Sequence, residues 1–195
     1  LRGDPTRVDW GSLELLLGLP VVLKTAESGS SVGVELVETV DALKACASDW
    51  LSQGSTVLVE SFLGGRELTC AVLETIDGDV EALPLVEIVV KEARFFDYDT
   101  KYDPDAVDEI CPAPVDGDLA ERVAALGLAA HEALGCRHYS RTDVMLDEDG
   151  EPVILETNTL PGLTSASLLP KSAEASGLSF PQLIQRLLDL AKAPR

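Results

Sequence analysis

The amino-acid sequence predicts an α+β protein in which helices and antiparallel strand pairs form two lobes. Asp77-Gly78 and Asp149-Gly150 each lie between short apolar segments, a pattern typical of antiparallel hairpins. Longer segments between them carry apolar residues at helical spacing. The joint Phe62-Leu63-Gly64-Gly65 favours a boundary between a small lobe, residues 1–63, and a large lobe, residues 64–195.

In the small lobe, apolar runs and turn residues predict the elements in order. The first dozen residues, Leu1 to Ser12, show no clear element, and Leu13 to Leu17 form a short helix ended by Gly18. Thr39 has the chemistry of a helix cap, and Gly54 that of a helix stop. The strands expected beside these helices are Val21–Lys24, Val34–Val37 and Thr56–Glu60.

In the large lobe, Glu67–Glu74 and Val80–Val90 are expected to pair around Asp77-Gly78. Residues 91–114 lack periodicity, and so long a connection favours a functional loop. Asp118 and Glu121 form a capping-box pattern at the start of a helix that Gly135 ends. A final amphipathic helix begins at Ser179–Gln182. Its expected inward residues are Leu183, Ile184, Leu187, Leu188 and Ala191.

Composition excludes several functional classes. Hydrophobic content is 46% and charged content 25%, as in ordinary globular proteins, and the formal net charge is −19. Nucleic acids and anionic membranes attract basic surfaces, so neither is an expected partner. No uncharged run reaches the ~18 residues of a membrane span, and the cysteines Cys46, Cys70, Cys111 and Cys136 have no CxxC spacing. We therefore expect a cytoplasmic protein with reduced, mostly buried thiols.

The strongest chemical signal is the segment from residue 139 to residue 158. If Asp149-Gly150 forms a two-residue turn, Asp143 lies opposite Glu156 and Arg141 lies opposite Asn158, all on one face. Carboxylates placed directly across a ladder repel one another, and a divalent cation would relieve the conflict. The oxygen donors of Asp143, Glu156 and Asn158 therefore predict a magnesium site beside an arginine.

Two alternatives remain open for this hairpin. Its acids can simply decorate a solvent-facing surface, although an arginine and an asparagine on the same face are then unexplained. Pro152 can introduce a bulge that shifts the register.

A glycine- and serine-rich segment, Lys24 to Gly33, lies between two expected strands. Small residues let backbone N–H groups approach phosphate oxygens, and a lysine supplies a positive charge. No GK[ST] follows, so this is not a Walker loop. Taken with a magnesium hairpin, the segment favours nucleotide binding over mere flexibility, because magnesium commonly completes its shell with phosphates.

Several motifs in order resemble the D-alanine–D-alanine ligases of the ATP-grasp superfamily, over their C-terminal two-thirds. The motifs are Lys24 with Ser28–Gly33, Val59–Leu63 with Gly65–Glu67, Phe96–Tyr102, Cys111–Ala113, Arg141–Asp143 and Glu156–Gly162. The resemblance implies an ATP-grasp fold with nucleotide between two lobes, and a loop 91–114 that closes over it. It implies ATP-dependent ligation of two D-alanines through an acyl phosphate, for peptidoglycan precursors, with two Mg²⁺ or Mn²⁺ ions.

The resemblance also assigns roles to individual residues. The nucleotide would be held by Lys24, Ser30, Ser31, Glu60, Ser61, Phe62, Leu63, Glu67 and Lys101. Arg141 and the Gly162 N–H would stabilise the oxyanion, Ser167 and Leu168 would seat the second D-alanine, and Tyr102 would hydrogen-bond Ser30. The metal ligands would be Asp143, Glu156 and Asn158.

The family's N-terminal domain has no counterpart here, and the chain opens at Leu1 without methionine. We therefore expect these residues to belong to a longer homodimeric protein, and this portion alone to be inactive and monomeric. Besides a D-alanine–D-alanine ligase, the sequence allows an ATP-grasp ligase for another amino acid or an inert nucleotide-binding protein.

Overall fold

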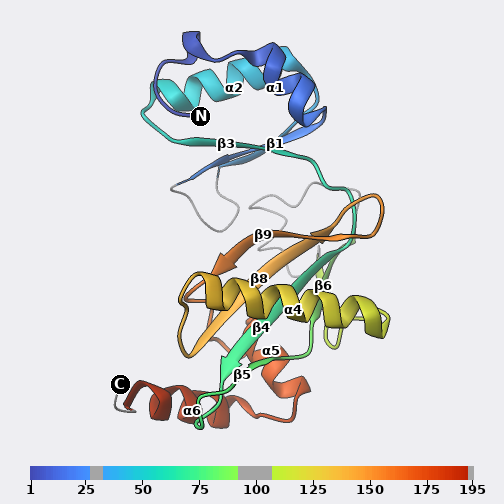
Figure 1. The fold of residues 1–195 in the computed structure, drawn as a ribbon, viewed down its shortest axis with the longest axis vertical. Coiled ribbons are helices and arrows are strands. Elements are labelled where there is room, and N and C mark those ends of the chain that lie inside the picture. The colour runs from blue at the N-terminus through green and yellow to red at the C-terminus, as the bar shows by residue number, and fades with distance from the viewer. Residues whose placement is uncertain (27–32, 92–106, 193–195) are drawn as a thin grey trace. The chain divides into compact units, whose positions relative to one another are not determined.

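The computed structural model describes residues 1–26, 33–91 and 107–192. The chain divides into two compact units (Figure 1). The first comprises Leu1–Phe62 and Val90–Val107, and the second comprises Leu63–Val89 and Asp108–Arg195. Each unit contains an antiparallel sheet and its own hydrophobic core.

The first unit packs two helices on one face of a three-stranded sheet (Figure 1). Its strands β1 (Val21–Thr25), β2 (Val34–Val37) and β3 (Val57–Ser61) lie in the order β2-β1-β3. The helices are α1 (Trp10–Leu17) and α2 (Val40–Ser52), preceded by a 3₁₀ turn, η1 (Pro5–Arg7). Thr39 caps α2 as expected, its hydroxyl accepting from the Ala42 N–H at 3.3 Å. The core residues are Val21, Leu23, Val37, Leu43, Ala47, Leu51 and Val57.

The second unit is built on a six-stranded sheet in the order β7-β6-β4-β8-β9, with β5 paired to β4. The strands are β4 (Glu67–Glu74), β5 (Val80–Ala82), β6 (Val86–Val90), β7 (Val107–Ile110), β8 (Tyr139–Leu146) and β9 (Pro152–Asn158). The helices are α4 (Gly117–Ala133), α5 (Leu168–Ala175) and α6 (Phe180–Lys192). The long pairing of β4 with β8 places the centre of the hairpin β8–β9 beside β4.

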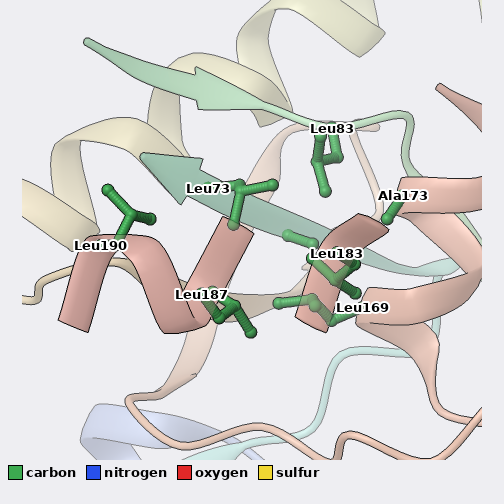
Figure 2. Close-up of a cluster of buried hydrophobic side chains, with 8 residues drawn as sticks. Leu73, Leu83, Leu169, Ala173, Leu183, Leu187 and Leu190 are labelled. Atoms are coloured by element: carbon green, nitrogen blue, oxygen red, sulfur yellow. The ribbon is translucent and has the colours of Figure 1, made fainter. Parts of the chain in front are cut away.

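The two faces of this sheet bury different residues of β4. Leu68, Cys70 and Val72 pack beneath α4, which approaches so closely that a Cβ at Gly127 would lie 2.6 Å from the Cys70 Sγ. Ala71 and Leu73 belong to the core that faces the opposite way, and Figure 2 shows Leu73 beside residues of α5 and α6. Because strand residues alternate, Glu67 and Thr69 share this second face with Ala71. The helices thus cover one end of the face, and polar residues occupy the other end.

Several local expectations were wrong. The first helix starts at Trp10, because the Asp9 side chain accepts a hydrogen bond from the Ser12 N–H at 3.0 Å. Asp116 caps α4 and places Asp118 in its first turn. The segment expected as one strand from Val80 to Val90 is divided between β5 and β6, and β7 lies within the expected loop 91–114. In α6, Leu190 is buried instead of Leu188 and Ala191.

The hairpin β8–β9 has the expected pairing at its polar end, but its turn and its register differ from those expected. Leu146 pairs with Pro152, so residues 147–151 form the connection and the expected two-residue turn is wrong. A bulge between Asp143 and Val144 then shifts the register by one residue. Asp143 consequently lies opposite Glu156, as the sequence predicted.

Candidate functional site

The polar cluster predicted from the sequence lies on β8 and β9. Arg141 and Asp143 project from β8, opposite Asn158 and Glu156 of β9. Asp143 is buried, with 8% of its surface exposed, whereas Glu156 is exposed. The structure therefore brings together all four side chains of the predicted magnesium hairpin.

Asp143 is the centre of the hydrogen-bond network. The Arg141 guanidinium donates from Nε to Oδ1 at 2.8 Å and from Nη2 to Oδ2 at 2.7 Å. The Asn158 amide donates to Asp143 Oδ2 and to Glu156 Oε1, each at 3.2 Å. Donors thus relieve the repulsion of the two carboxylates in this structure, a solution that the sequence argument did not consider.

The environment keeps Arg141 charged. Burial is the largest single influence and acts to lower the pKa of its guanidinium, whereas the hydrogen bonds and charge of Asp143 act in the opposite direction. The charges of Glu156 and Glu67 add to this, and the net effect raises the pKa of Arg141 above its ordinary value. A permanent cation therefore lies beside two carboxylates of the hairpin.

The donor set fits a magnesium ion. Within the described residues, no group of three or more His, Cys, Asp or Glu side chains is arranged to hold a metal ion. Asp143, Glu156 and Asn158 instead offer two carboxylates and one amide, all hard oxygen donors. A cation here would require Asn158 to turn its amide so that the oxygen replaces Nδ2. It would also displace part of the Arg141 fork.

β4 contributes two further polar residues to this face. Glu67, expected to bind ribose, pairs with Met145 of β8 and is half-buried. Thr69 pairs with Asp143, and its Oγ1 donates to Asp143 Oδ1 at 2.7 Å. Thr69 was not among the site residues predicted from the sequence. The available signal was a threonine inside an otherwise apolar strand, but the pairing of β4 with β8 was not predicted.

The first unit contains a separate group of predicted nucleotide-binding residues. Lys24 of β1 forms an ion pair with Glu60 of β3, with 2.5 Å between Nζ and Oε2. The Ser61 hydroxyl donates to the Leu17 carbonyl oxygen at 2.9 Å, while Phe62 is 38% exposed. Leu63, half-buried, is the first residue of the second unit.

The residues expected to seat the second substrate lie around the start of α5. Ser167 occupies the N-cap position without capping the helix by its side chain. Its Oγ instead lies 2.9 Å from the Thr164 Oγ1 and accepts from the Thr164 N–H at 3.2 Å. Gly162 is exposed, and a Cβ there would lie 2.8 Å from the Ser167 Oγ. Leu168 begins the helix, so these three residues form one compact corner.

The remaining predicted site residues, Ser30, Ser31, Lys101 and Tyr102, lie outside the described residues. Among the residues that the structure does describe, no helix is both long enough and apolar enough to cross a membrane.

Comparison with known proteins identifies similar chains. The family model described as "D-ala D-ala ligase C-terminus" matches residues 9–189. The curated D-alanine–D-alanine ligase of Desulfotalea psychrophila is 47% identical over 176 residues, 89% of this chain and 54% of that protein. The chain therefore spans about half the length of the curated relatives it matches.

Solved structures of ligases are also similar to this chain. The D-alanine–D-alanine ligase of Bacillus anthracis, complexed with ATP, is 36% identical with a TM-score of 0.76, over 94% of this chain and 57% of that one. The VanG D-Ala:D-Ser ligase of Enterococcus faecalis is 33% identical with a TM-score of 0.76, over 92% of this chain and 52% of that one.

Proposed function

Because the chain belongs to the D-alanine–D-alanine ligase C-terminal family, we propose that its natural protein ligates two D-alanines with ATP. The product, D-alanyl-D-alanine, would serve peptidoglycan precursor synthesis. The observation that carries the proposal is the cluster of Arg141, Asp143, Glu156 and Asn158 on one hairpin of a chain with this membership. The same cluster can bind a metal–phosphate group and a developing negative charge.

The proposed reaction has two steps. A carboxylate oxygen of the first D-alanine attacks the γ-phosphorus of ATP, and the bond from that phosphorus to the β,γ-bridging oxygen breaks, giving an acyl phosphate and ADP. The amine of the second D-alanine then attacks the acyl carbon. A C–N bond forms, the C–O bond to phosphate breaks, and the attacking neutral amine loses one proton to phosphate or solvent.

The chain's own residues have proposed roles in these steps. Arg141 and the Gly162 N–H donate to the carbonyl oxygen as it gains charge, where fixed donors are most effective. Ser167 and Leu168, at the start of α5, seat the second D-alanine. Ser30, Lys101 and Tyr102 complete the catalytic set by resemblance alone.

For the nucleotide, we propose that residues 1–63 and 64–195 are the two lobes of the ATP-grasp fold. Lys24 and Ser31 contact phosphates, and Glu67 contacts the ribose. The strand end formed by Glu60, Ser61, Phe62 and Leu63 holds the adenine. The Lys24–Glu60 ion pair supports this grouping, because it keeps the lysine on the sheet as a defined point charge.

For the cation, we propose that Asp143, Glu156 and Asn158 hold Mg²⁺, or Mn²⁺ in its place. Magnesium usually takes one or two protein carboxylates and fills its shell with water and phosphate oxygens, which matches this donor set. When bound, it neutralises charge on the transferred phosphoryl group. We further propose a cytoplasmic homodimer for the natural protein, where ATP and both amino acids are available.

A second candidate is a ligase that joins D-alanine to another amino acid. It is favoured by the similarity to a D-Ala:D-Ser ligase, at the same TM-score as to the D-alanine–D-alanine ligase. The corner formed by Gly162, Ser167 and Leu168 would then accept a second substrate other than D-alanine.

The experiment is D-alanine-dependent ADP release by the natural protein, after its intact mass has been measured. We expect D-alanine alone to stimulate release, and Glu156→Gln to abolish it without changing the melting temperature, because Glu156 is exposed. Glu148→Gln, on the same hairpin but in its turn, is the matched control and should retain activity. Stimulation only when a second amino acid is added would favour the second candidate. Unchanged turnover in Glu156→Gln would overturn the metal assignment.

A further inference from the structure

Thr69 is a polar residue in the buried interior of β4. Its neighbours Leu68 and Cys70 are fully buried, and Thr69 itself is only 1% exposed. A hydroxyl removed from water costs free energy unless it makes a hydrogen bond. The partner of this hydroxyl therefore matters for the role of the residue.

That partner is the carboxylate at the centre of the polar cluster. The Thr69 Oγ1 lies 2.7 Å from Asp143 Oδ1 and 3.3 Å from the Thr142 carbonyl oxygen. A hydroxyl has one proton to donate, and the bond to an ionised acceptor is the shorter and stronger. Because Thr69 and Asp143 are direct partners in the β4–β8 register, the backbone fixes this contact.

The other donors to Asp143 are a charged guanidinium and an amide that can rotate. Arg141 donates to both oxygens and Asn158 donates to Oδ2. With Thr69, these donors occupy the roughly four acceptor sites of a carboxylate, so an incoming cation must replace at least one. Arg141 would be repelled by the cation, and Asn158 can turn its amide oxygen inward. Thr69 can do neither, because it is neutral, short and buried.

We infer that Thr69 is a positioning residue for the cation-binding carboxylate of Asp143. Its hydroxyl holds Oδ1 both with and without the cation, and leaves Oδ2 available as arginine and asparagine rearrange. The inference rests on the proposed function, in which Asp143 is a magnesium ligand. Residues that orient a ligand typically contribute about 10–100-fold to metal affinity.

The test measures binding of Mn²⁺ by the natural protein in the presence of ATP, from the electron paramagnetic resonance signal of free Mn²⁺. We expect Thr69→Val, which keeps the shape but loses the donor, to weaken Mn²⁺ binding by about tenfold or more. Thr69→Ser retains the hydroxyl and should bind as the wild type does. If Thr69→Val does not fold, Thr69→Cys, a much weaker donor, replaces it with the same expected loss.

The matched control is Thr142→Val on the adjacent strand. Thr142 is equally buried, and its hydroxyl lies 2.9 Å from the Thr157 Oγ1 rather than at Asp143. Equal losses of Mn²⁺ affinity in Thr69→Val and Thr142→Val would overturn the inference, since both would then reflect general loosening of the sheet.

Asp143→Asn separates this inference from the proposed function. If Asp143→Asn weakens Mn²⁺ binding and Thr69→Val does not, the positioning role is wrong and the metal assignment stands. If Asp143→Asn binds Mn²⁺ as the wild type does, the metal assignment itself fails and the inference fails with it. Support requires a loss in both variants and recovery in Thr69→Ser.

Discussion

Two arginine–carboxylate pairs of the second unit have nearly the same geometry and different surroundings. Arg66 donates to the two Glu87 oxygens at 2.6 and 2.8 Å, and Arg141 donates to the two Asp143 oxygens at 2.8 and 2.7 Å. In both pairs the carboxylate is buried, at 7% exposure for Glu87 and 8% for Asp143. Fork geometry alone therefore does not distinguish a structural pair from a functional one.

The surroundings of the two carboxylates differ. At the first pair, Arg66 also donates to the Pro114 carbonyl oxygen at 3.1 Å, joining the residue before β4 to the segment between β7 and α4. Its pKa is raised chiefly by the hydrogen bonds to Glu87. At the second pair, the carboxylate receives further donors from neighbouring strands and lies opposite the exposed Glu156. The Arg141 fork binds Asp143 alone, so the carboxylate of Glu156 beside it keeps its negative charge for a ligand cation.

The largest expected effect is on activity, from Arg141→Lys. Lysine keeps the charge but cannot donate as a planar fork, so in the proposed reaction the developing oxyanion would lose a fixed donor. We expect D-alanine-dependent ADP release to fall roughly 10²–10³-fold, with little change in melting temperature. Arg137→Lys, an exposed arginine just before β8, is the control. An unchanged rate in Arg141→Lys would mean that the Arg141–Asp143 pair, like the Arg66–Glu87 pair, is structural.

The next effect is on stability, from Arg66→Met. Removing Arg66 leaves the Glu87 carboxylate buried without its fork, which costs about 3 kcal/mol at most, because the Arg66 side chain is 41% exposed. Urea unfolding measures this loss, and the KM for ATP of the folded variant serves as the functional readout. We expect the KM to change little.

The double variant Arg66→Met/Glu87→Leu tests whether the loss comes from the stranded charge. Replacing both members of a buried pair by apolar residues is often neutral or stabilising. We therefore expect the double variant to recover most of the lost free energy of unfolding. A double variant as unstable as Arg66→Met would mean that Arg66 acts through Pro114 and not through Glu87.

Local sequence patterns predicted most of the fold. Hydrophobic alternation and turn residues located β2 and β4 at their observed bounds, and the ATP-grasp fold implied by resemblance is confirmed by the structural neighbours. The pairing of Asp143 with Glu156 is also confirmed. It was obtained, however, from a two-residue turn in place of the connection 147–151, which displaces the register by one residue, and without the bulge that displaces it back, so the two errors cancel.

The remainder depended on contacts between residues far apart in sequence. Nothing local to Glu67–Glu74 indicates that β8, some seventy residues later, lies beside it, so Thr69 could not be connected with Asp143. The choice of Asp116 over Asp118 as the cap of α4 is likewise a competition between two equivalent acids. In α6, Leu187 and Leu188 were both expected to face inward, and packing against β4 and α5 buries Leu187 and Leu190 but leaves Leu188 exposed.

The smallest expected effect is a pH dependence of stability from His131. This residue of α4 contacts β8 on the face of the sheet opposite to Arg141. It is 3% exposed, and its Nδ1 lies 2.8 Å from the Ser140 Oγ of β8. Burial lowers the pKa of His131, and the nearby Glu74 carboxylate, 3.9 Å from the His131 Nε2, only partly opposes this. The unfolded chain therefore binds a proton more readily than the folded protein once the pH falls below about 6.5. Stability contributed by the neutral imidazole is present above that pH and is lost below it.

The guanidinium groups of Arg66 and Arg141 stay charged between pH 5.5 and 7.5. A change in stability over this range therefore does not come from their protonation. Urea unfolding at pH 7.5 and 5.5 should show a loss of free energy in the wild type that is smaller in His131→Gln, which retains a hydrogen-bonding group toward Ser140. His138→Asn is the control, because asparagine tolerates the left-handed backbone at φ 67°, and it should follow the wild type. Equal losses in the wild type and in His131→Gln would assign the pH dependence to carboxylates instead. The arginine–carboxylate cluster on the opposite face would then be the first place to look for it.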